Sequence, residues 1–279
     1  VVAFVDKHVT LPSRRLRYLM TGLAFIFAVA ALPAWALAST PLMPNAATQP
    51  PQGSWTTYGI LSNTGVTNTG PSLVQGDLGS SGNSSATAVT GFQPSGPGVV
   101  TGKIVLGGAA ITAQTDATAA VNALESQITT CTTLNGDLGG RTLVPGVYCF
   151  SAGLTGTLIL NAGADPNAVF IFLTSNNLVV NPNAAVVLIG SSSCNVYWRT
   201  NALASLDTNV SFIGTIFASS QVTMNSGAKL VGRAIAQTAN VTLINNSIAS
   251  GCAAGSTATA TPTVTPPPPA TQTAVSVAT

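Results

Sequence analysis

The sequence predicts a mainly β fold, and three observations favour a β-solenoid. Short apolar runs separated by turns rich in Asn, Gly and Ser fill residues 134–248. Within them, residues 214–218 align with 232–236, and residues 222–224 align with 241–243, at offsets of 18 and 19 residues. A period of about 20 residues with a strand in each unit is typical of stacked coils. Charged residues make up only 6% of the chain.

The expected strands are short, and shorter apolar pieces occur between Gly59 and Gly108. Frequent turns between short strands also fit a β-sandwich, which is the rival fold. The scarcity of charge and the irregular period favour the solenoid. The expected β runs are residues 157–160, 169–173, 178–180, 186–189, 196–198, 212–218, 229–236 and 241–244.

Residues 109–128 are predicted to form a helix, the one convincing helix after residue 38. Small and aliphatic residues recur there at three- and four-residue steps, as on one helical face, and no Gly or Pro interrupts them. Because the face is mostly alanine, the helix can pack closely on a flat surface. The face consists of Ala113, Ala117, Ala120, Val121, Leu124 and Ile128.

The first 38 residues are predicted to be a secretory signal peptide. Arg14, Arg15 and Arg17 precede an apolar run over residues 19–32, and residues 36–38 form an A-x-A cleavage site. An uncleaved anchor helix is the alternative, because the run approaches the ~20 residues needed to span a membrane. We expect a secreted, extracellular protein, with cell-surface association as a variant, and no membrane span after cleavage.

Composition divides the chain into four segments. They are the signal peptide (1–38), a Pro-, Ala- and Thr-rich linker (39–54), a β-solenoid domain (55–252) and a Pro/Thr-rich disordered tail (253–279). The tail holds four consecutive prolines at 266–269, which favour an extended chain.

Four cysteines in an exported chain predict disulfides, and three pairings are possible. The set Cys131–Cys149 and Cys194–Cys252 is favoured, because the first pair closes a short loop and leaves the other two as partners. No C-x-x-C spacing occurs, so neither a redox nor a zinc role is expected.

Ionisable side chains, which catalysis and metal binding need, are scarce. From residue 39 onward there are five bases and six acids, and the one histidine of the chain, His8, lies in the leader. Without imidazole, Ser-His-Asp and Cys-His nucleophiles and His-based zinc sites are excluded. Asp77, Asp137 and Asp165 adjoin Gly or Pro, which is turn chemistry. Too few bases exist to neutralise nucleic-acid phosphates. No enzyme activity, metal or cofactor is expected.

Nine motifs occur in a fixed order, and together they resemble the secreted ice-binding-protein-like β-solenoid family, shared by microbial ice-binding and adhesin-type proteins. The match covers about residues 55–252. The motifs are VTNTGPSLVQGDLG (66–79), VTGF (89–92), the Ala-rich helix after Gly108, LGGRTLVPGVYCF (138–150), LTGTLIL (154–160), DPNAVFIF (165–172), CNVYW (194–198), FIGTIFA (212–218) and GRAIA (232–236).

The resemblance implies a discontinuous β-solenoid (β-helix) of roughly triangular section with one long α-helix packed along it. It also implies that the N-terminal coil segment stacks beside coils formed late in the chain. Ice-binding members use a flat face, often with Thr-Ala/Gly-x-Thr/Asn steps. Such a step occurs from Thr64 to Thr67; another, from Thr112 to Thr115, falls in the expected helix and is taken as coincidence.

Strand alternation gives candidate positions for that face. With Leu158, Leu160, Leu178, Val180, Leu206, Val222, Met224, Val241 and Leu243 inward, one outward row is Thr157, Val179, Ser205, Thr223 and Thr242. A second row is Ile159, Asn181, Asp207, Asn225 and Ile244. Asp207 and Ile244 make this second row less suitable as an ice-binding face. The candidate ice-binding residues are Thr64, Thr67, Thr157, Val179, Asn181, Ser205, Thr223, Asn225 and Thr242. The alternative is a solvated β surface, since strands are rich in Thr and Val anyway.

Two functions follow as hypotheses. The first is adsorption to ice crystals by a monomer, with no chemical step. The second is a cell-surface adhesin or structural module that binds a surface or matrix component and not ice. A polysaccharide-cleaving enzyme, suggested by β-helix analogy alone, is disfavoured because histidine is absent after the leader and the acids are isolated.

Overall fold

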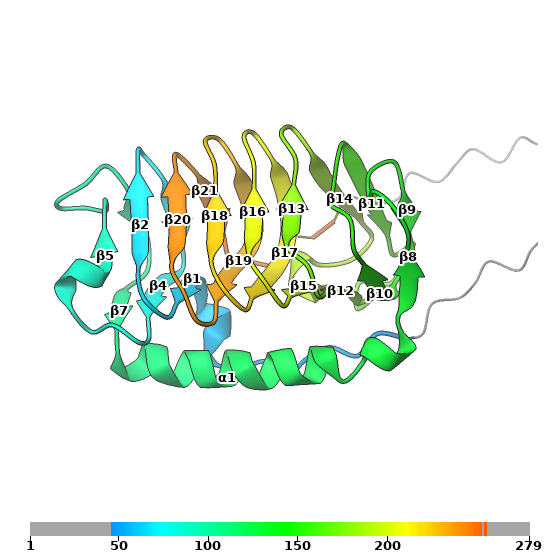
Figure 1. The fold of residues 1–279 in the computed structure, drawn as a ribbon, viewed down its shortest axis with the longest axis horizontal. Helices are drawn as coiled ribbons and strands as arrows, with labels where there is room; N and C mark the ends of the chain where they lie inside the picture. The colour runs from blue at the N-terminus through cyan, green and yellow to red at the C-terminus, as the bar shows by residue number, and fades with distance from the viewer. Residues whose placement is uncertain (1–45, 253, 256–279) are drawn as a thin grey trace, which may run out of the picture. The chain divides into compact units, whose positions relative to one another are not determined.

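The computed structural model describes residues 46–252, 254 and 255, which form a β-solenoid with a long helix along it (Figure 1). Strand pairs in this part of the chain are parallel, and each coil has three sides. The predicted mainly β solenoid with one long helix is confirmed. The predicted signal peptide and the tail beyond residue 255 lie outside the described residues.

One side, which we call the open side, is a separate six-stranded sheet. Strands from late in the chain are followed in space by β2 and β5 from near its start, so the solenoid is discontinuous in sequence. This is the order that the resemblance implied. In spatial order the strands are β13 (Leu178–Val180), β16 (Ala204–Leu206), β18 (Val222–Met224), β20 (Val241–Ile244), β2 (Val66–Thr69) and β5 (Val89–Thr90).

The larger sheet forms the other two sides, which we call the helix side and the third side. Two long strands, β17 (Ser211–Ala218) and β19 (Lys229–Ala236), serve both. Besides them, the helix side has β7 (Ile104–Leu106), β4 (Asp77–Ser80), β1 (Tyr58–Ser62), β15 (Val196–Thr200), β12 (Phe170–Thr174), β10 (Gly146–Phe150) and β8 (Thr132–Leu134). The third side has β6 (Val99–Val100), β3 (Leu73–Gln75), β21 (Ser247–Ala249), β14 (Ala185–Ile189), β11 (Thr157–Asn161) and β9 (Thr142–Leu143).

Glycine stands where β17 and β19 pass from one side to the other. Gly214 and Gly232 are paired, with φ of 114° and 152°. A Cβ on Gly232 would lie 2.0 Å from the carbonyl oxygen of Gly214. Side chains are therefore excluded at this corner, and the residues after it pair as the repeat alignment predicted.

The interior is apolar and includes every residue predicted to point inward; all of them are buried. Aromatic rings from successive coils stack on one another inside it. The rings of Phe172 and Trp198 are parallel with centroids 3.9 Å apart, and Trp198 also contacts Phe212. Stacked coils thus share one continuous core.

Helix α1 (Gly108–Glu125) covers the helix side. The alanines on its inner face, Ala110, Ala113, Ala117 and Ala120, are fully buried, so the helix lies close to the strands as predicted. Glu125 pairs with the buried Arg199 of β15 at 2.8 Å. The prediction extended the helix to Ile128, but this residue is exposed in a separate 3₁₀ turn, Ile128–Thr130. Within the described region no helix is long and apolar enough to cross a membrane.

Residues 48–54, expected in the linker, are bound to the domain. The amide and hydroxyl of Ser54 donate to the carboxylate of Asp116 in α1, at 2.7 and 2.6 Å. Gln49 and Gln52 both donate to the hydroxyl of Tyr197. The ordered contacts therefore begin before Trp55. The remaining 3₁₀ turns are Ser54–Thr57, Ala86–Ala88 and Ser193–Asn195.

Both favoured disulfides are present. Cys131–Cys149 joins the segment after α1 to β10, and Cys194–Cys252 ties the end of the folded region to the start of β15.

Candidate functional site

Threonine occupies the same outward position in four consecutive strands of the open side. Thr223 pairs with Thr242, Thr242 with Thr67, and Thr67 with Thr90. Thr67 and Thr90 are exposed, and the other two are partly exposed. We call these four residues the threonine ladder. Ser205 and Val179 occupy the same position in the next two strands.

The local sequence explains why the ladder faces outward. In each of its strands a valine precedes the threonine, and these four valines are paired with one another. Because side chains alternate across a strand, valine on the core face places threonine on the outer face. Val222, Val241 and Val66 are buried, and Val89 packs against the same core.

The ladder has a regular geometry. Paired residues on adjacent strands are ~4.8 Å apart, and alternate residues along one strand are ~6.6 Å apart. β-branched threonine has few χ1 rotamers, so its methyl and hydroxyl groups are held in place. Thr242 is fixed further, because the side-chain amide of Asn240 donates to its hydroxyl at 3.1 Å.

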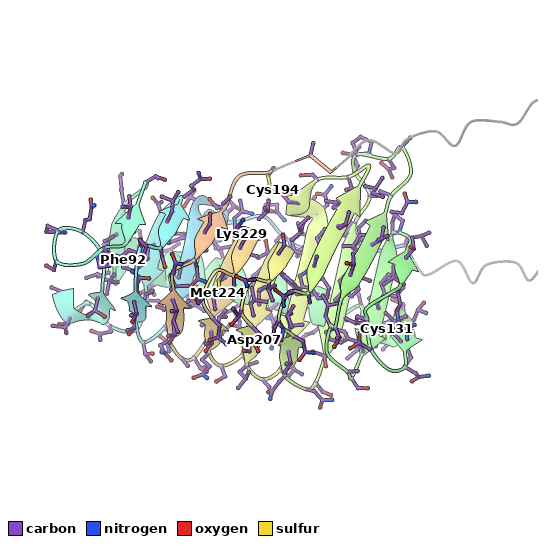
Figure 2. All side chains as sticks on the ribbon, turned by 90° about the horizontal axis from the view of Figure 1, so that it is seen from above. Phe92, Cys131, Cys194, Asp207, Met224 and Lys229 are labelled. Carbon is purple, nitrogen blue, oxygen red and sulfur yellow. A yellow bond between two sulfur atoms is a disulfide. The ribbon has the colours of Figure 1, made fainter. Side chains whose placement is uncertain are left out.

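A second outward row lies two residues farther along the strands. It comprises Asn181, Asp207, Asn225, Ile244 and Thr69. The amide of Asn225 donates to Asp207 Oδ1 at 3.0 Å, and the amide of Asn181 donates to Thr155 Oγ1 at 2.9 Å. The Asn225 hydrogen bond is the main cause that holds the pKa of Asp207 below its usual range. Figure 2 shows Asp207 on the open side and Lys229 on the neighbouring side.

The other two sides are less accessible or less uniform. Helix α1 covers the helix side. On the third side, Lys229 is exposed, and Ala254 lies in a bridge with Ser192. Ala254 lines a hollow of about 290 Å³ together with Val187 and Ile213 of this side. On the open side, the strands carry uncharged side chains outward, and no segment within residues 46–252, 254 and 255 covers them (Figure 1).

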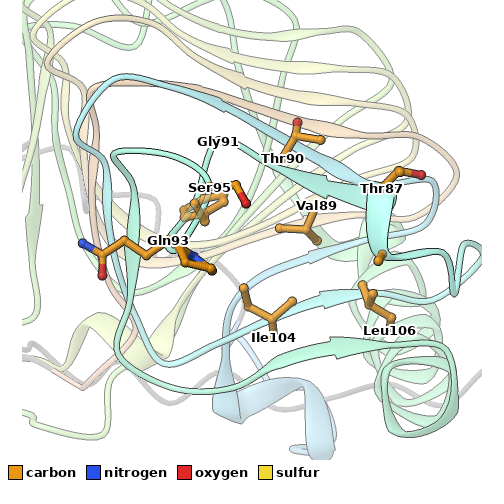
Figure 3. Close-up of a pocket in the computed structure, with 11 residues that line it drawn as sticks. Thr87, Val89, Thr90, Gly91, Gln93, Ser95, Ile104 and Leu106 are labelled. Atoms are coloured by element: carbon orange, nitrogen blue, oxygen red, sulfur yellow. The ribbon is translucent and has the colours of Figure 1, made fainter.

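A hollow of about 540 Å³ lies where β5 and β7 end the stack (Figure 3). Val89, Ile104 and Leu106 line it, together with the hydroxyl-bearing Thr87 and Ser95. Its lining residues include no ionisable side chain, so it lacks an acid–base pair for catalysis. Within the described part of the chain, no three His, Cys, Asp or Glu residues are grouped as metal ligands would be.

Most predicted face residues come together on the open side. Thr67, Val179, Ser205, Thr223 and Thr242 share the first row, and Asn181 and Asn225 share the second. Thr64 lies outside both rows: it is exposed in the turn before β2, and its amide donates to Ala239 O.

The placement of Thr157 and Ile159 in these rows was wrong. Both belong to β11 on the third side, where Thr157 pairs with Ala185. The open-side segment of that coil is instead residues 153–155, where Leu154 bridges to Val180. Alternation tells inward from outward, but it does not tell which side of a coil a strand occupies.

Thr90 was missed. Its signal was present in the sequence, because Val89-Thr90 repeats the Val-Thr pairs at 66–67, 222–223 and 241–242. The strand is two residues long and is followed by Gly91 and a turn, so no period-2 run marks it.

Comparisons with known proteins agree with this fold. The family model for ice-binding-like proteins matches residues 60–249. The chain is 39% identical over 204 residues to an ice-binding protein of Nostoc sp. (strain HG1), covering 72% of this chain and 74% of that protein.

Solved structures give the same result. An ice-binding protein from an Antarctic biological consortium superimposes with a TM-score of 0.69 and 32% identity, over 75% of this chain and 94% of that one. The ice-binding protein of the Antarctic ascomycete Antarctomyces psychrotrophicus gives a TM-score of 0.67 and 30% identity, over 73% and 99%. The chain therefore belongs to the ice-binding-like family.

Proposed function

We propose that this protein is secreted and adsorbs to ice crystals through the threonine ladder, and that it slows their growth or recrystallisation. The relatives named above are ice-binding proteins, which supports ice as the target. The observation that carries the proposal is the unbroken register of Thr223, Thr242, Thr67 and Thr90 on a side that no described segment covers.

Adsorption requires a surface that fixes water in an ordered array. Four threonines repeat methyl and hydroxyl groups at ~4.8 Å steps on a backbone locked by parallel strand pairing. Because the rotamers are already restricted, little side-chain entropy is lost when the ladder meets an ordered surface. The hydroxyls hydrogen-bond to water at the interface, and the methyl groups keep the array from relaxing into bulk hydration.

The function involves no covalent step. Binding is the sum of many weak contacts on a rigid plane, so it depends on the shape of the plane more than on any single group. One bulky side chain in the ladder holds a crystal plane away from its neighbours and removes several contacts together. Tyrosine is suited to this purpose because it is large and tolerated in strands.

The direct test measures thermal hysteresis and ice-recrystallisation inhibition for Thr223→Tyr and Thr242→Tyr. Both variants are expected to lose activity while keeping the wild-type melting temperature, because the side chains point outward. Thr157→Tyr is the matched control: Thr157 is an exposed strand threonine on the third side, so this variant is expected to remain active.

Activity retained in both ladder variants would refute the ladder as the contact surface. An inactive wild-type protein at high concentration would favour the cell-surface or matrix module instead.

A further inference from the structure

We propose that Asp207 marks the border of the ice-contacting surface, confining contact to β18, β20, β2 and β5 and excluding β13. This inference rests on the proposed function and specifies which part of the open side meets ice.

Asp207 differs in charge from everything around it on this side. Among the described residues of the six open-side strands and the residues directly before and after each strand, it is the one ionisable side chain. Asn181 and Asn225 occupy the matching positions on either side of it. On one side of β16 lie the four ladder strands, and on the other lies β13 with Val179.

The carboxylate is held in place and ionised. Its Oδ1 accepts hydrogen bonds from Asn225 Nδ2 at 3.0 Å, from the Thr208 amide at 2.7 Å and from the Thr208 hydroxyl at 3.3 Å. All three hydrogen bonds go to Oδ1, which leaves Oδ2 to be hydrated by water. These donors favour the charged form and lower the pKa of Asp207. No cationic side chain contributes to that shift.

A fixed charge is incompatible with contact against ice. Removing an ion from liquid water carries a large free-energy penalty unless a partner of opposite charge compensates it. Water molecules in a crystal cannot reorient around a carboxylate as liquid water does. A crystal plane lying on the ladder must therefore end before Asp207, and Val179, on the strand beyond, is separated from that plane.

The asymmetry of the open side agrees with this border. On the ladder side of β16 every first-row residue is threonine, whereas on the other side the row holds Val179. The next coil beyond β13 has no strand on this side: its segment is Gly153, Leu154 and Thr155, and Leu154 points into the core. The regular hydroxyl array and the uncharged surface end near the same strand.

A double-mutant cycle tests the border, with thermal hysteresis and melting temperature measured for the wild type, Val179→Tyr, Asp207→Asn and the combination. In the wild type, Val179→Tyr is expected to leave activity unchanged, because ice does not reach β13. Asp207→Asn, which keeps the size of the side chain, is expected to raise activity by extending the contact surface. In the Asp207→Asn background, Val179→Tyr is expected to cancel that gain.

Asp165→Asn is the matched control for loss of one acidic charge, because Asp165 is an exposed turn residue away from the open side. It is expected to change nothing. The border is refuted if Val179→Tyr abolishes activity in the wild type as Thr242→Tyr does, or if Asp207→Asn gains no activity. An inactive wild type defeats the proposed function itself, so the two failures are distinguishable.

Discussion

Asparagine at the corner between the open side and the third side shows how single residues shape the coils. Asn183, Asn209 and Gly227 have φ of 59°, 58° and 77°, and each is the third residue of a four-residue turn. A type II β-turn requires a positive φ at its third residue, and glycine and asparagine adopt that conformation most readily. The corner therefore repeats in coil after coil without lengthening the loop.

Substitution of Asn183 tests this explanation. Asn183 is exposed, so Asn183→Ala is expected to lower the free energy of unfolding by about 1 kcal/mol through left-handed strain alone. Asn183→Gly, the control, is expected to match the wild type because glycine has no Cβ. Denaturant unfolding measures both, and equal destabilisation by the two variants would contradict the explanation.

Carboxylates set the pH dependence of stability. Hydrogen bonds from the side chain and then the backbone of Ser54 lower the pKa of Asp116, and the Asn225 side chain lowers that of Asp207. A lowered pKa in the folded state stabilises the fold above the unfolded pKa of about 3.9, and the contribution is lost as pH falls through the folded value. His8, the one histidine, lies outside the described residues.

The melting temperature is therefore expected to be constant from about pH 8 to 5 and to fall below about pH 4, as these carboxylates gain protons. Thermal unfolding followed by circular dichroism across this range measures it. A transition near pH 6.5 would show that a group other than these carboxylates controls stability.

For the candidate site, the sequence predicted correctly which strand residues point inward and which point outward. It did not predict in every case which of the three sides of the coil a strand belongs to. Thr223 and Thr242 were predicted because their strands repeat at a regular offset. Thr157 was misplaced because its coil reaches the open side through residues 153–155, which lack a strand pattern. Thr90 escaped because a two-residue strand has no measurable period.

At the scale of elements, the alanine face of α1 determines how closely the helix lies on the helix side. Ala110, Ala113, Ala117 and Ala120 are fully buried against the strands. Larger side chains there must displace the helix or strain the packing. The three- and four-residue spacing predicted this face, but the helix end at Glu125 depends on a following turn that the spacing does not show.

Enlarging one of these alanines tests the close approach. Ala117→Leu is expected to destabilise the protein by about 1–3 kcal/mol through overpacking. Ala119→Leu, on the exposed face of the same helix, is expected to stay within about 0.5 kcal/mol of the wild type. Chemical denaturation measures the free energy of unfolding of both variants. Similar values for the two would mean that α1 does not pack closely on the strands.

At the scale of the whole solenoid, the ladder joins parts of the chain that are far apart in sequence. Thr67 and Thr242 are paired although 175 residues separate them. The periodicity near residues 214–243 predicted local stacking but carried no information on this long-range junction. This junction, the pairing of β2 with β20, was predicted from the family resemblance alone, because the periodicity of the sequence does not link the two segments.

The central claim is that these distant strands form one ice-contacting plane, and the most direct test is incorporation of fluorescently labelled protein into slowly growing ice. Wild-type protein and Thr157→Tyr are expected to enter the crystal, whereas Thr67→Tyr and Thr242→Tyr are expected to be excluded equally. Incorporation of Thr67→Tyr at the wild-type level, with Thr242→Tyr excluded, would contradict a plane that crosses the β20–β2 junction.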